Sequence, residues 1–303
     1  MTQLEQNNKL KKLAVIASIS VSISLIVFKF VAFVKTDSLA VFSSLVDSAT
    51  DLFSSAISFV AVYYSMKPAS HNHRYGYGKT EAISALMQAI FVGASGIFVI
   101  FDGINRLFNP VIISSIGVGI YIMLISIFAT LVLVLYQIYV AKKTQSLAIK
   151  ADMAHYVVDF LTNSTVIISL FLVKVFDFVY FDIIAALFIS LYLLYNAYSL
   201  AKESIEQLTD KELDDDIRNN ISKIVLECDN VLGMHDLRTR NIANIYYIEF
   251  HLEINGDESL LFAHQISDNV ENKILSKYPS SQILIHQDPY GIKEDRLDNK
   301  ISV

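Results

Sequence analysis

The sequence predicts an α-helical membrane protein, with a six-transmembrane-helix domain followed by a cytoplasmic α+β domain of ferredoxin-like (α-β-β-α-β) type. Three observations lead to this prediction. First, 53% of the 303 residues are hydrophobic, only 18% are charged, and the mean hydropathy is +0.46, as is typical of membrane proteins. Second, the first two thirds of the chain contain apolar runs of about 20 residues or more, long enough to cross a bilayer. Third, the last third changes to short amphipathic segments.

Charge divides the chain at the same point. Residues 1–202 contain 14 Lys/Arg and 10 Asp/Glu, a net charge of +4, whereas residues 203–303 contain 10 and 20, a net charge of −10. An acidic region of this size can hold a core of its own. The predicted parts are a membrane domain over 1–207, an acidic α+β domain over 208–291, and a disordered tail over 292–303.

The membrane spans follow from apolar runs separated by charged or Pro-containing connections. Lys29, inside the first span, is expected near the far end of that span, where its ammonium group can reach the interface. Connections with clustered Lys/Arg alternate along the chain, so the positive-inside rule places both termini and the acidic domain in the cytoplasm. The predicted spans are residues 13–35, 38–65, 80–107, 112–140, 151–174 and 178–201.

The acidic domain shows a different pattern. Residues 244–254, NIYYIEFHLEI, alternate strictly between apolar and polar, which is typical of a strand with one buried face. The order helix, strand, strand, helix, strand suggests a small ferredoxin-like sandwich. The predicted elements are a helix over 210–227, strands over 233–241 and 244–254, a helix over 258–277 and a strand over 281–287. Cys228 is the single cysteine, which excludes an internal disulfide and a thiolate metal cluster.

Two membrane spans carry ionisable side chains at a depth where charge is costly, about 2.5–3.5 kcal/mol each even on the most lenient scale. Asp47 and Asp51 lie four apart in the second span, and His155 and Asp159 lie four apart in the fifth. Residues four apart share a helix face. One nitrogen and three carboxylates suit Zn²⁺, Cd²⁺ or Fe²⁺. The alternative, from the fifth span taken alone, is a buried His–Asp hydrogen bond that only joins helices.

The seven histidines each lie near another potential ligand. In the alternating strand, His251 shares a face with Glu249 and Glu253, and His286 and Asp288 share a face two residues apart. Without thiolates, such a group fits Zn²⁺ or a neighbouring divalent ion, whereas a single surface histidine is usually only a solvated side chain. The predicted strands can bring together His235, His251 and His286.

These motifs resemble the cation diffusion facilitator family, and within it the bacterial zinc and ferrous-iron efflux pumps. The resemblance covers the chain from about residue 10 to residue 290. The segments DSLAVFSSLVDSATDLFSS and ADMAHYVVDF are similar to the family's second-helix and fifth-helix signatures. GMHDLRTR and ILIHQDP are similar to parts of its cytoplasmic domain.

The resemblance implies a transport site and a binuclear cytoplasmic site at a dimer interface. It also implies that Lys79 and Asp210 form a salt bridge between the membrane and soluble parts. The implied transport ligands are Asp47, Asp51, His155 and Asp159, and the implied cytoplasmic ligands are His235, His251, His264, His286 and Asp288.

The sequence departs from the family in the loop after the second span. Relatives carry one Asp and two His there, whereas the aligned residues of this chain are Ser70, His73 and Tyr77. His73 is the only family ligand that remains, and His71 could substitute for another. A third metal site in this loop would be a loose one.

These features predict a homodimeric secondary transporter, not an enzyme, that exports Zn²⁺, or Fe²⁺ or Cd²⁺, across the cytoplasmic membrane in exchange for protons. The metal is both the transported and the regulatory ion, no separate cofactor is expected, and the partners are the lipid bilayer, metal ions and protons, with no nucleic acid. Metal ligands must be deprotonated, so ion and protons compete for the same groups. Rigid-body rocking of helices around a midplane site would give alternating access.

Three other classes fit less well. An intramembrane metallohydrolase would use the same ligands to activate water, but the sequence has no HExxH pair and no spare general base. A metal sensor whose helices only dimerise has no use for four charges in the bilayer. A channel is disfavoured because a closed four-ligand site releases ions slowly.

Overall fold

The chain folds into two compact units, Met1–Ile205 and Glu206–Val303. The computed structural model describes residues 3–36, 39–108, 117–176, 181–293 and 295–301. Within several helices further side chains also lie outside this description, among them that of Asp47.

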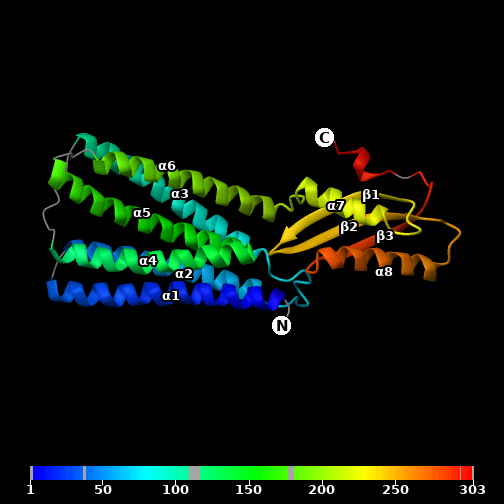
Figure 1. Cartoon of the computed structure of the whole chain (residues 1–303), viewed down its shortest axis with the longest axis horizontal. Coiled ribbons are helices and arrows are strands. Elements are labelled where there is room, and N and C mark those ends of the chain that lie inside the picture. The colour runs from blue at the N-terminus through cyan, green and yellow to red at the C-terminus, as the bar shows by residue number, and fades with distance from the viewer. Residues whose placement is uncertain (1–2, 37–38, 109–116, 177–180, 294, 302–303) are drawn as a thin grey trace. The chain divides into compact units, whose positions relative to one another are not determined.

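The described part of the first unit consists of six long helices that run alongside one another (Figure 1). Each has 27 to 34 residues, more than the roughly 20 that cross a bilayer. By length and composition, three of the described stretches, Glu5–Lys35, Thr80–Phe101 and Tyr121–Thr144, could each span a membrane. The helices are α1 (Gln3–Thr36), α2 (Leu39–Ser65), α3 (Thr80–Phe108), α4 (Gly117–Thr144), α5 (Leu147–Phe176) and α6 (Phe181–Leu208).

A buried ion pair ties one end of this bundle together. Lys11 Nζ of α1 lies 2.8 Å from Glu81 Oε1 of α3, and their side chains are 5% and 1% exposed. Ser65, at the end of α2, donates to the same oxygen at 2.7 Å, and Ser146, between α4 and α5, donates to Glu81 Oε2. Glu81 therefore joins segments from four parts of the chain, which fixes the helix ends.

The prediction for Lys29 is wrong. Its side chain is buried, with 5% exposed, and its Nζ donates to Ser48 Oγ of α2 at 2.7 Å. A hydroxyl acceptor on the adjacent helix is available inside the bundle, so the ammonium group does not extend to the interface.

Small residues bring α3 and α6 together. A Cβ on Gly93 would lie 3.6 Å from Ala197 Cβ, and a Cβ on Gly96 would lie 3.3 Å from side-chain atoms of Leu193 and Leu194. Such close approach is typical of membrane helices, whose association depends on packing rather than on the hydrophobic effect.

The second unit has the predicted order of elements. Its three-stranded sheet has the order β1-β2-β3, with β1 antiparallel to β2 and β2 parallel to β3. Ala243 and Asn244 join β1 to β2 with φ of 49° and 72°, as a two-residue type I′ hairpin requires. The elements are α7 (Asp215–Leu226), β1 (Gly233–Ile242), β2 (Ile245–Ile254), α8 (Leu260–Lys277), β3 (Gln282–Pro289) and the 3-10 turn η1 (Leu297–Asn299).

The core of this unit lies on one face of the sheet. Phe250 and Leu252 of β2 pack with Ile221 of α7 and Val270 of α8, all of them buried. The period of two in β2 therefore turns His251 to the face that α7 and α8 do not cover, as the alternating pattern predicts.

The tail differs from the disorder predicted for residues 292–303. In the described residues, the N–H groups of Leu297 and Asp298 donate to the Asp236 carboxylate, both at 2.9 Å, and the Asp236 N–H donates to Asp298 Oδ2 at 2.8 Å. These reciprocal hydrogen bonds could not be predicted from composition alone, because Asp236, in β1, lies some 60 residues away in the sequence.

Candidate metal centres

The first candidate centre lies between α2 and α5. His155 Nε2 is 3.0 Å from Asp51 Oδ1 and 3.8 Å from Asp159 Oδ2. One ligand atom from each of these residues lies within 4.8 Å of the others. Ligands 2.0–2.2 Å from a tetrahedral ion lie roughly 3.3–3.6 Å apart, so these three groups have the spacing of a metal site.

The fourth predicted ligand of this centre is Asp47. It lies in α2 one helical turn before Asp51, and its side chain is outside the described residues. Asp51 is buried, with 8% exposed, and the side chains of His155 and Asp159 are partly buried, with 19% and 26% exposed. Isolated buried charges are costly, so these groups are more stable with a bound cation than without one.

Asp152, which sequence reasoning missed, forms a buried polar network beside this centre. Its side chain is 0% exposed and accepts from Ser55 Oγ at 3.0 Å and from Gln137 Nε2 at 2.7 Å. Tyr156 Oη lies 2.8 Å from the same Ser55 Oγ. Because Ser55 follows Asp51 by one turn of α2, the network supports the helix that carries a candidate ligand. An acid three residues before His155 in an apolar helix was the signal that could have found it.

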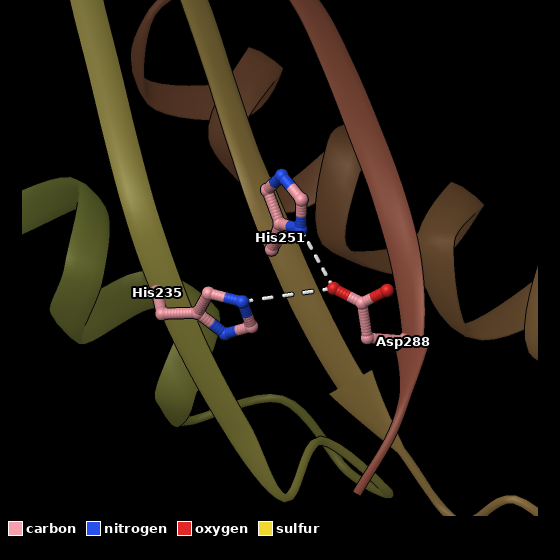
Figure 2. A group of neighbouring side chains, drawn as sticks. All are labelled: His235, His251 and Asp288. Carbon is pink, nitrogen blue, oxygen red and sulfur yellow. Dashed lines mark hydrogen bonds and ion pairs between the residues drawn. The ribbon is translucent and has the colours of Figure 1, made fainter. Parts of the chain in front are cut away.

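The second candidate centre lies on the uncovered face of the sheet. Figure 2 shows His235, His251 and Asp288 on three neighbouring strands, with both imidazoles turned toward the carboxylate. Asp288 Oδ2 is 2.7 Å from His251 Nδ1 and 3.6 Å from His235 Nε2. The register explains the grouping, because His235 pairs with His251 across β1 and β2, and His251 with His286 across β2 and β3.

Asp288 also faces a third histidine. His286 Nε2 lies 3.2 Å from Asp288 Oδ1, and its ring centroid lies 4.6 Å from that of His251. One carboxylate thus has different imidazoles at its two oxygens, an arrangement that can bridge two ions. His264 is not part of this group within one chain. It lies on α8, 65% exposed, with Nε2 3.5 Å from Asp268.

The strand that carries His235 is irregular just after it. The register shifts between His235 and Arg238, and Asp236 has φ of 53°, in the left-handed region. Burial acts to raise the pKa of the Asp236 carboxyl, but the N–H groups of Leu297 and Asp298 outweigh it and the pKa is lowered. The bulge therefore holds a charged carboxylate beside the candidate centre.

The loop after α2 shows a different arrangement. The ring of His73 stacks on Tyr77 at 4.5 Å between centroids, and Ser70 Oγ lies 3.0 Å from Tyr77 Oη. His71 Nδ1 lies 3.1 Å from Asn72 Oδ1. Where side chains are described, the groups of three or more candidate ligands include neither His71 nor His73. The salt bridge expected between Lys79 and Asp210 joins the two units and stays a prediction; within its own unit, Asp210 Oδ2 lies 3.6 Å from Arg240 Nη1.

Comparison with known proteins agrees with this architecture. Residues 15–209 match the model of the cation efflux transmembrane domain, and residues 213–290 match that of the cation efflux protein cytoplasmic domain. The chain is 42% identical over 277 residues to "Protein p34" of Rickettsia prowazekii (strain Madrid E), covering 91% of this chain and 92% of that protein. It is 37% identical over 293 residues to the "Cation-efflux pump FieF" of Shewanella oneidensis, covering 97% and 99%.

A solved structure described as the metal-bound C-terminal domain of the CzcD transporter from Thermotoga maritima is also similar. The identity is 26% and the TM-score 0.25, covering 26% of this chain and 93% of that one.

A helical transmembrane domain followed by a cytoplasmic α/β domain, with candidate metal centres in both, defines a cation-efflux transporter. The chain belongs to the cation diffusion facilitator family, a family of transporters.

Proposed function

We propose that this transporter exports Zn²⁺, or Fe²⁺ or Cd²⁺, from the cytoplasm in exchange for protons. One observation supports this proposal above the others: His155 Nε2 lies 3.0 Å from Asp51 Oδ1 and 3.8 Å from Asp159 Oδ2, between two membrane helices. With Asp47 as fourth ligand, the site offers one nitrogen and three oxygens. This set of imidazole and carboxylate ligands, without a thiolate, suits divalent ions and does not favour Cu⁺.

Proton exchange follows from the chemistry of these ligands. An imidazole and carboxylates bind metal only when deprotonated, so each arriving proton weakens the hold on the ion. An inward proton gradient then favours metal release on the outer side and metal loading on the inner side. Rocking of helices around the site would expose it to each side in turn.

The proposed working form is a homodimer with both termini and the second unit in the cytoplasm. The positive-inside rule supports this orientation. The centre at His235, His251, His286 and Asp288 would bind cytoplasmic metal and regulate transport, with His264 as a further ligand at the dimer interface. Lys79 and Asp210 would hold the two units together.

The test is metal uptake into proteoliposomes that contain the purified chain, with and without a pH gradient. We expect uptake of Zn²⁺, Fe²⁺ and Cd²⁺, each tested in turn, to rise when the pH gradient drives protons out of the proteoliposomes. We also expect metal entry to acidify the external solution. Uptake that is the same at every gradient, for every metal, would contradict proton exchange while leaving metal transport intact.

A further inference from the structure

One acidic side chain connects the tail to the cytoplasmic metal centre. Glu253 of β2 is 8% exposed, and its Oε1 lies 3.2 Å from His235 Nδ1. The same Oε1 accepts from Arg296 Nη2, in the segment that was expected to be disordered. Arg296, Glu253 and His235 therefore form a chain of contacts that ends at a candidate ligand.

The two ring nitrogens of His235 have different neighbours. Nδ1 faces the Glu253 carboxylate, whereas Nε2 faces Asp288 Oδ2 at 3.6 Å. Because the Glu253 carboxylate is the nearer of the two, it favours the tautomer with the proton on Nδ1, which leaves the Nε2 lone pair facing Asp288. Carboxylates commonly orient metal-binding histidines in this way.

The backbone also makes room for this carboxylate. Gly233 pairs with Glu253 across β1 and β2, and a Cβ on Gly233 would overlap with Glu253 Oε2. A side chain at position 233 would therefore displace the carboxylate from His235.

Residues 295–300, called the tail segment from here on, are held in a position from which Arg296 reaches Glu253. Leu297 and Asp298, whose N–H groups donate to the Asp236 carboxylate, directly follow Arg296 in the chain. Asp236 itself directly follows His235. The bulge in β1 and the tail are thus joined directly next to the Arg296–Glu253 contact. Arg296 itself is 34% exposed, so its guanidinium bridges from the surface to a buried carboxylate.

We propose that the tail segment positions the cytoplasmic metal centre, with Arg296 holding Glu253 against His235 so that His235 presents Nε2 to the ion. This inference rests on the proposed metal-binding role of that centre. Because coupling between two events is reciprocal, bound metal then orders the tail as the tail strengthens metal binding. The tail segment thereby takes part in the proposed regulation of transport by cytoplasmic metal.

The test measures Zn²⁺ dissociation constants on the full chain in detergent, by competition with a chelator, in an Asp51→Ala/His155→Ala background that removes the membrane centre. Loss of an outer-shell partner typically weakens metal binding about 10–100-fold. We expect this loss for Glu253→Gln, a loss near the lower end for Arg296→Gln, and partial rescue by Arg296→Lys. The matched control is Lys300→Gln, which removes another tail cation, paired with Asp295 at 2.7 Å and 57% exposed.

A second readout is amide hydrogen exchange at Leu297 and Asp298, where Zn²⁺ should slow exchange in the background chain but not in Arg296→Gln. Equal Zn²⁺ affinity for Arg296→Gln and Lys300→Gln, with tail exchange indifferent to Zn²⁺, would overturn the positioning role. His235→Ala separates this failure from that of the centre itself. If His235→Ala binds Zn²⁺ as tightly as the background chain, the proposed centre fails and the inference fails with it.

Discussion

Replacing Lys11 by Met should destabilise the membrane unit strongly, because it leaves Glu81 charged and buried with only two hydroxyl donors. The side chains of the pair are 5% and 1% exposed, and their charged atoms lie 2.8 Å apart. Removing one partner of a buried ion pair typically costs about 3–5 kcal/mol, whereas an exposed pair contributes about 0–1 kcal/mol. At about 2–4 °C per kcal/mol for a unit of this size, Lys11→Met should lower the thermal midpoint by about 6–20 °C.

The assay is thermal unfolding of the purified chain in detergent, with two comparisons. Lys150→Met removes the lysine of a pair whose side chains are 28% and 46% exposed, and should change the midpoint by about 4 °C or less. Lys11→Met/Glu81→Gln should recover most of the loss, because a neutral amide accepts from one of the two serine hydroxyls, Ser65 or Ser146, through its oxygen and donates to the other through its NH2 group. If Lys11→Met and Lys150→Met shift the midpoint equally, or if the double substitution recovers nothing, the account of this ion pair is wrong.

Three further predictions concern packing and ligands. Gly96→Leu should lower the thermal midpoint, because a Cβ there already lies 3.3 Å from Leu193; Ala at the same position should have a smaller effect. Asp152→Ala should destabilise the unit by about 1–3 kcal/mol for each buried donor that loses its acceptor, as measured by unfolding in detergent; an unchanged midpoint would contradict its structural role. His235→Ala should weaken Zn²⁺ binding by the cytoplasmic unit far more than His264→Ala, as titration of both variants would show, since His235 lies within the group of one chain whereas His264, 65% exposed, would join it only at the dimer interface.

The sequence predicted the elements that have a clear period. The alternation in residues 244–254 correctly placed His251 opposite Phe250 and Leu252, because a strand has only two faces. The four-residue spacing of His155 and Asp159, and the depth of Asp51, were enough to predict that the three would converge if α2 and α5 pack together.

Contacts between distant segments could not be predicted in the same way. Lys29 was expected at the interface, but its acceptor, Ser48, lies on another helix. The tail was expected to be disordered, although Asp236 caps it from 61 residues away. Neither contact can be recognised from the local sequence, since each depends on where the fold places a single polar atom. His264 illustrates the converse: a histidine near other histidines in the sequence still lies outside the group they form within one chain.

The central claim is that Asp51 and His155 bind the transported ion. The most direct measurement is Zn²⁺ uptake into proteoliposomes under a fixed pH gradient, comparing the native chain with Asp51→Ala, His155→Ala and the control Glu203→Gln, which neutralises an exposed carboxylate on α6. We predict that both site substitutions abolish uptake while the control keeps the native rate. Native uptake rates in Asp51→Ala and His155→Ala would contradict the account.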